Sequence, residues 1–117
     1  METKQQFHDI LKSKMDAYAH EIYRITRDFP KSELYGLVSQ LRRAAISVIL
    51  NYIEGYARQR KAVLKNFLEI SYGSLKESKY LVYFSSRQKY ITQVEEKRLL
   101  QLSEDIGAML WGILKNL

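Results

Sequence analysis

The chain of 117 residues has no cysteine, a single proline and only five glycines. The absence of cysteine excludes disulfides, thiolate metal sites and cysteine nucleophiles. Because hairpin turns depend on glycine and Asn-Gly pairs, their scarcity argues against β-strands. No apolar run approaches the roughly 20 residues of a membrane-spanning helix, and the opening segment METKQQFHDILKSK does not resemble a signal peptide. We therefore expect one cytoplasmic, helical domain over residues 1–117.

Positive charge is in excess. The formal net charge is +6 and the sequence pI is about 9.5. A basic chain of this size attracts anionic partners, of which nucleic acid is the first to consider.

Apolar residues recur at spacings of three and four along the whole chain, which predicts long helices. The expected helices cover residues 5–28, 32–56, 62–88 and 92–117. Pro30 ends the first helix, and Ser32 is expected to cap the second with its side chain. Thr92 and Glu95 have the spacing of a capping box for the fourth. Four long helices with short links favour an all-α fold, an antiparallel up-and-down four-helix bundle.

The second helix is more apolar than a surface helix needs to be. One stripe, expected to face the core, comprises Leu34, Leu37, Leu41, Ala44, Ala45, Val48 and Tyr52. A second stripe beside it comprises Ile46, Ile49, Leu50 and Ile53. Because a helix in a small monomeric bundle buries only one stripe, the second stripe predicts a partner chain and therefore a homo-oligomer.

A narrow polar strip runs along the same helix. It comprises Gln40, Arg43, Ser47, Asn51 and Glu54. In one interpretation Arg43, Asn51 and Glu54, with Arg58 beyond them, contact a ligand or nucleic acid. In the other, Glu54 pairs with a basic residue and Asn51 satisfies backbone groups near the helix end. We favour the structural interpretation, since a charge pair is acceptable at an interface when its hydrogen bonds are complete.

Two further basic features stand out near this helix. Arg42 projects into the second apolar stripe, where a lone charge is costly, and an acidic or phosphate partner across an interface would remove that cost. The link between the second and third helices carries Arg58, Arg60 and Lys61. Only Glu54 opposes these cations, so the link is the first choice for phosphate contact.

The third helix carries apolar residues and serines on its expected inner face. The apolar ones are Val63, Phe67, Ile70, Leu75, Leu81 and Val82. Its outer face carries Lys65, Tyr72, Lys76, Lys79, Tyr80, Tyr83 and Arg87. Cations interleaved with aromatic rings suit single-stranded nucleic acid, but tyrosines are also enriched where subunits pack together. Glu69 and Glu77 interrupt the positive run and weaken the nucleic-acid interpretation.

Candidates for catalysis are few. His8 and His20 both lie on the first helix, and Asp16 with His20 could bind a metal only weakly from its outer face. The sequence contains no Glu-x-x-His pair, glycine-rich phosphate loop or nucleophile elbow. We expect no enzymatic activity, no metal and no cofactor.

Two strings resemble a known family. They are FPKSELYGLVSQLRRAAISVILNYIEGYAR, residues 29–58, and FLEISYGSLKES, residues 67–78. The matching residues of the first are Phe29, Pro30, Glu33, Tyr35, Gly36, Leu37, Gln40, Arg42, Arg43, Ala44, Ser47, Asn51, Glu54, Gly55 and Arg58. Those of the second are Phe67, Leu68, Gly73, Ser74 and Glu77. On these motifs the chain resembles the bacterial proteins encoded in intervening sequences of 23S ribosomal RNA genes.

The resemblance implies an up-and-down four-helix bundle that assembles as a ring-like homopentamer. It also implies kinship with accessory proteins of diversity-generating retroelements, which bind nucleic acid and a reverse transcriptase. The leading hypothesis is a non-enzymatic oligomer that binds RNA through its basic surface. The residues expected to contact RNA are Arg42, Arg43, Arg58, Arg60, Lys61, Lys76, Lys79 and Tyr80. The alternative is a scaffold for a partner protein, with Tyr72, Tyr80, Tyr83 and Trp111 as anchors.

Overall fold

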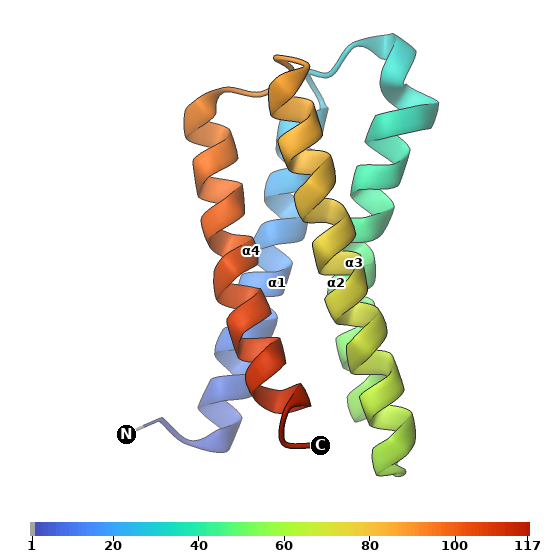
Figure 1. The fold of residues 1–117 in the computed structure, drawn as a ribbon, viewed down its shortest axis with the longest axis vertical. Coiled ribbons are helices and arrows are strands. Elements are labelled where there is room, and N and C mark those ends of the chain that lie inside the picture. The colour runs from blue at the N-terminus through green and yellow to red at the C-terminus, as the bar shows by residue number, and fades with distance from the viewer. Residues whose placement is uncertain (1) are drawn as a thin grey trace.

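The computed structural model describes residues 2–117 as four α-helices that run alternately up and down (Figure 1). These are α1 (Lys4–Thr26), α2 (Ser39–Tyr56), α3 (Lys61–Arg87) and α4 (Gln93–Leu114). Each helix packs against the next in the chain, and α4 also packs against α1, which closes the bundle. The predicted antiparallel four-helix bundle is confirmed. Both termini lie at the end of the molecule that carries the link between α2 and α3.

Helix starts follow local sequence at two of the four helices. The predicted capping box of α4 is confirmed, because Thr92 Oγ1 accepts from the Glu95 N–H at 3.0 Å and Glu95 Oε1 accepts from the Thr92 N–H at 2.9 Å. Thr3 and Gln6 form the same reciprocal pair at the start of α1. Such pairs satisfy N–H groups that have no partner within the helix.

The predicted side-chain cap at Ser32 is wrong. A 3-10 turn at Lys31–Glu33 and a π-helical segment at Leu34–Val38 precede α2, and neither has a side-chain cap. The wider π turn changes the direction in which side chains leave the helix. Leu34, predicted to face the core, is therefore 48% exposed, and Tyr35 is 92% exposed.

One hydrophobic core runs through the bundle. The predicted core stripe of α2 is confirmed at Leu41 and Val48, which are fully buried, and Leu11, Met15 and Tyr18 of α1 are fully buried beside them. On α3 the predicted inner face is partly wrong. The buried line there is Leu68, Ser71, Leu75, Ser78, Val82 and Ser85. This line has alternating steps of three and four, the spacing of a heptad seam, and it leaves Ile70 on the exposed side.

The packing of α2 against α3 depends on small residues. The Ser71 hydroxyl donates to the Val48 carbonyl at 2.6 Å, and the Ser47 and Ser74 hydroxyls lie 2.8 Å apart. A β-carbon placed on Gly55 would lie 3.0 Å from that of Phe67, so only glycine fits there without a shift. The two helices therefore approach closely at these three points.

Candidate nucleic-acid interface

The basic link lies at the end of the bundle that joins α2 to α3. The chain leaves α2 after Tyr56, and Arg60 is the residue that immediately precedes α3. Arg58 Nη2 binds Glu54 Oε1 at 2.5 Å, and its guanidinium lies over the Phe67 ring at 5.2 Å. Arg60 and the following Lys61 are exposed, and within residues 2–117 neither forms an ion pair. Both cations are therefore available to a phosphate.

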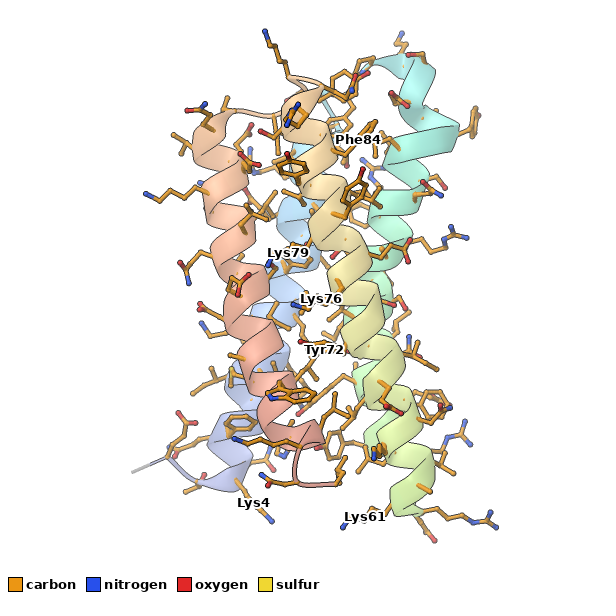
Figure 2. All side chains as sticks on the ribbon, in the orientation of Figure 1. Lys4, Lys61, Tyr72, Lys76, Lys79 and Phe84 are labelled. Atoms are coloured by element: carbon orange, nitrogen blue, oxygen red, sulfur yellow. The ribbon has the colours of Figure 1, made fainter. Side chains whose placement is uncertain are left out.

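Lysine side chains from other elements lie at the same end. Figure 2 shows Lys4 of α1 and Lys61 of α3 at this end of the molecule. Lys12 lies about 12 Å further along α1 than Lys4, and both lysines are close enough to His8 to influence its ionisation. Sequence reasoning did not connect α1 to the basic link, because the relevant lysines are more than forty residues away in the chain.

Arg42 and Arg43 lie in a separate place. At 1.5 Å of rise per residue, Arg42 is roughly 24 Å from Arg58 along α2. Arg42 Nε donates to Thr26 Oγ1 at 2.8 Å, and its guanidinium lies over the Tyr23 ring at 4.6 Å. The lone charge expected in the apolar stripe is thus supported by α1 of the same chain. Arg43 is exposed and forms no ion pair within the described part of the chain.

An open groove of about 640 Å³ follows the outer side of α2 at Arg42 and Arg43. Leu34, Tyr35 and Leu50 contribute apolar surface to it. Leu50 is 56% exposed, and Ile53, one turn further along α2, is 50% exposed. Two residues of the second apolar stripe are therefore open to solvent in this chain, while Ile46 and Ile49 are half-buried.

The polar strip of α2 makes contacts within the bundle. Asn51 Nδ2 donates to the carbonyl and to the hydroxyl of Ser47, each at 2.8 Å, and the Ser47 hydroxyl in turn meets Ser74. Glu54 is the carboxylate that pairs with Arg58. Gln40 is exposed. These contacts favour the structural interpretation of Ser47, Asn51 and Glu54, which stays a prediction.

Lys76, Lys79 and Tyr80, the residues of α3 that were predicted to contact RNA, lie close to neighbouring side chains. Lys79 pairs with Glu104 of α4, and this contact lowers the pKa of the Glu104 carboxyl. Lys76 Nζ lies 5.1 Å from the centre of the Tyr72 ring (Figure 2). Tyr80 is exposed and lies 6.4 Å from Tyr83, ring centre to ring centre. The surface thus offers one cation on an aromatic ring and open tyrosines rather than free lysines.

Sequence reasoning did not find an aromatic cluster that lies between α1 and α2. His8 Nδ1 forms a hydrogen bond with the Tyr52 hydroxyl, and the Tyr56 ring lies 4.8 Å from the His8 ring, edge to face. Burial lowers the pKa of His8, with Lys12 and Lys4 acting in the same direction and Asp9 against it. Burial also raises the pKa of Tyr52 and Tyr56. The one available signal was the spacing of the two tyrosines, one helical turn apart.

The structure also bears on metal sites and on membrane-spanning helices. Among residues 2–117, no group of three or more histidine, aspartate and glutamate side chains could hold a metal ion. Asp16 and His20 lie 3.4 Å apart on an exposed face, as the sequence indicated. In the same part of the chain, none of the helices combines the length and apolar character needed to cross a bilayer.

Comparisons with known proteins identify the family. A solved structure from Bacteroides thetaiotaomicron, described as a protein of unknown function from the S23 ribosomal protein family, superposes with a TM-score of 0.85 at 23% identity. The match covers 93% of this chain and 98% of that one. No curated protein sequence matches this chain. The family model of the 23S rRNA-intervening sequence protein matches residues 9–112, and the chain therefore belongs to the 23S rRNA-intervening sequence protein family.

Proposed function

We propose that this protein is a non-enzymatic, cytoplasmic homo-oligomer that binds RNA electrostatically at the basic end of the bundle. The observation that carries the proposal is the pair of exposed cations Arg60 and Lys61, with lysines of α1 at the same end. Phosphate contacts require cations that are not already paired, and this end supplies them. Arg58, which pairs with Glu54, adds positive charge at this end. Arg43, near the start of α2, would contact a phosphate at a separate place.

Oligomer formation is proposed from the outer side of α2. Exposed Leu34 and Leu50 line one groove beside α2, and a second copy of the chain would cover this apolar surface. The resemblance suggests a ring of five copies. A closed ring would repeat the basic end around its axis and multiply the weak phosphate contacts of one subunit.

The test is the binding of a fluorescent, structured RNA at several salt concentrations. Two double variants with the same change in net charge are compared. Arg60→Glu with Lys61→Glu reverses the two unpaired charges of the basic link, and Lys31→Glu with Lys89→Glu reverses the charges of exposed residues at the opposite end. We expect the first variant to reduce the slope of log affinity against log salt by about two, one unit for each phosphate that is no longer neutralised. The second variant is expected to retain the wild-type slope within about one-half.

A flat salt dependence of the unmodified protein would contradict the proposal. Equal weakening of RNA binding in the two variants would show that only the total charge matters and would remove the basic link from the interface. Light scattering of the same samples gives the mass of the free protein and of its RNA complex. A monomeric free protein would contradict the oligomer.

A second candidate function is a scaffold for a partner protein. The exposed aromatic residues of α3 and α4 favour it, since Trp111 is 56% exposed and Tyr80 is 60% exposed. Tyrosine and tryptophan dominate the energetics of many protein interfaces. Under this alternative, Trp111→Ala would abolish capture of a protein partner such as a reverse transcriptase, while the charge-reversed basic link would leave that capture intact.

A further inference from the structure

A small cavity opens between α1 and α2, close to the basic link. Its volume is about 380 Å³, within the range of sites that bind small organic groups. Gln5, His8 and Lys12 of α1 and Tyr52, Ile53 and Tyr56 of α2 line it. Ala57, at the edge of the cavity, directly precedes Arg58 in the basic link.

The aromatic wall of this cavity is held in place by contacts within the chain. Tyr52 is buried, and its hydroxyl is bound to His8 Nδ1. The Tyr56 ring lies 4.9 Å from the Tyr52 ring and 4.8 Å from the His8 ring, ring centre to ring centre. Tyr56 keeps 41% of its surface exposed, so it is the ring that a flat ligand can reach. A wall with fixed rotamers costs little conformational entropy when a ligand stacks on it.

The polar groups of the cavity suit the edge of a nucleobase and a phosphate. His8 Nε2 has no hydrogen-bond partner within residues 2–117, whereas Nδ1 binds the Tyr52 hydroxyl. The Gln5 side chain donates to Asp9 at 2.9 Å, which leaves its carbonyl oxygen as an acceptor. Lys12 forms no ion pair in the described part of the chain and adds a positive charge to the rim. Single-stranded RNA is recognised in this way, by stacking, by base-edge hydrogen bonds and by phosphate contacts.

We propose that the cavity formed by His8, Tyr52 and Tyr56 binds one unpaired nucleobase of the RNA. The base stacks on Tyr56, its edge meets His8 Nε2 and the Gln5 carbonyl, and its phosphate lies against Lys12. The strand then continues past Ala57 to Arg60 and Lys61. This inference rests on the proposed RNA binding and adds a site that reads the base rather than the backbone. Positive charge at both ends of the path favours a polyanion over a protein segment or a second copy of the chain.

The test compares two fluorescent oligonucleotides of equal length and charge. One is a single-stranded RNA with its bases, and the other is the same strand with abasic sites throughout. The Tyr56→Ala variant is expected to weaken binding of the base-bearing strand by about five-fold or more, because one base no longer stacks. It is expected to leave binding of the abasic strand unchanged. Tyr56→Phe keeps the ring and is expected to bind both strands as the unmodified protein does.

Two controls separate stacking from other effects of the substitution. Phe84→Ala removes an exposed aromatic ring that belongs to no proposed binding surface and is expected to leave the ratio of the two affinities unchanged. The unmodified protein gives a second readout that needs no variant: the His8 ring proton signals in NMR are expected to shift with the base-bearing strand and to stay in place with the abasic one. This readout holds even if Tyr56→Ala fails to fold.

Equal weakening of both strands by Tyr56→Ala would overturn the base site, since Tyr56 would then act on the backbone or on the fold. A change in oligomer mass with unchanged RNA affinity would show that the cavity lies between copies of the chain, which also overturns it. If both strands bind with strong salt dependence and Tyr56→Ala has no effect, the base site fails while the proposed RNA binding stands. If neither strand binds, the proposed function itself fails.

Discussion

The two sides of α2 are built from different residues and serve different contacts. The side that faces α3 has small residues at its closest contacts, where Ser47 meets Ser74 and the Val48 carbonyl accepts from Ser71. The outer side exposes Leu50 and Ile53 with nothing over them in this chain. One helix thus has two kinds of surface, one packed closely within the chain and one open. Close packing within the chain needs small side chains, and an open apolar surface needs another molecule.

The largest expected effect is on the outer side of α2. A charge at Leu50, as in Leu50→Glu, would be buried without a partner in an oligomer and is expected to dissociate it. Burial of the leucine side chain alone is worth about 1.5–3 kcal/mol for each interface. Helicity should remain, since Leu50 is more than half exposed in the single chain. Sedimentation or light scattering gives the mass, and Gln101→Glu, an exposed polar position on α4, is the control that should keep the oligomer.

The next largest effect is on stability and concerns the side of α2 that faces α3. Gly55→Ala places a β-carbon 3.0 Å from that of Phe67, and overpacking of this kind costs about 1–3 kcal/mol of unfolding free energy. Gly73→Ala is the matched control, because a β-carbon there meets nothing within 4 Å. In a helix interior that change is expected to stabilise the fold by about 0.5–1 kcal/mol. Urea unfolding measures both, and two changes of the same sign would contradict the close approach of the helices.

A smaller loss of stability is expected when the Ser71 hydroxyl between α2 and α3 is removed. Ser71→Ala removes the hydrogen bond to the Val48 carbonyl and should cost about 1 kcal/mol of unfolding free energy. Ser32→Ala tests the wrong cap prediction, since Ser32 is exposed and caps no helix through its side chain. We expect no change in stability for that variant beyond about 0.5 kcal/mol. If Ser32→Ala destabilised the protein as much as Ser71→Ala does, the Ser32 side chain would have to cap a helix after all.

The smallest effect is a pH dependence at the end of α2, where Tyr52 and Tyr56 meet His8. Burial, Lys12 and Lys4 hold the pKa of His8 below its ordinary value of 6.5, against the opposing charge of Asp9. The unfolded chain therefore takes up a proton before the folded chain does, and stability falls as the pH drops below 6.5. Thermal unfolding of the protein at pH 7.5 and at pH 5.5, about one unit to either side, should show this decrease. His8→Gln should reduce the difference, and His20→Gln, at an exposed position on the same helix, should keep it.

Sequence reasoning was most successful where spacing alone decides. The buried stripe of α2, the capping box at Thr92 and the four helices all follow from residues a few positions apart. It failed at Leu34, because a π turn shifts the direction of side chains without any change in apolar content. It also missed the cavity at His8, since Tyr52 is 44 residues away and only the closed bundle brings the two rings together.

The helices, their order and the excess of positive charge follow from the amino-acid sequence alone, because helix formation and net charge depend on local spacing and on composition. Which cations are free and which are engaged follows only from the packed bundle. Arg42 is held by α1 and Lys79 by α4, while Arg60 and Lys61 stay open at the end of the bundle. Pairing and burial depend on distances across the bundle, and those distances are set when the four helices pack together.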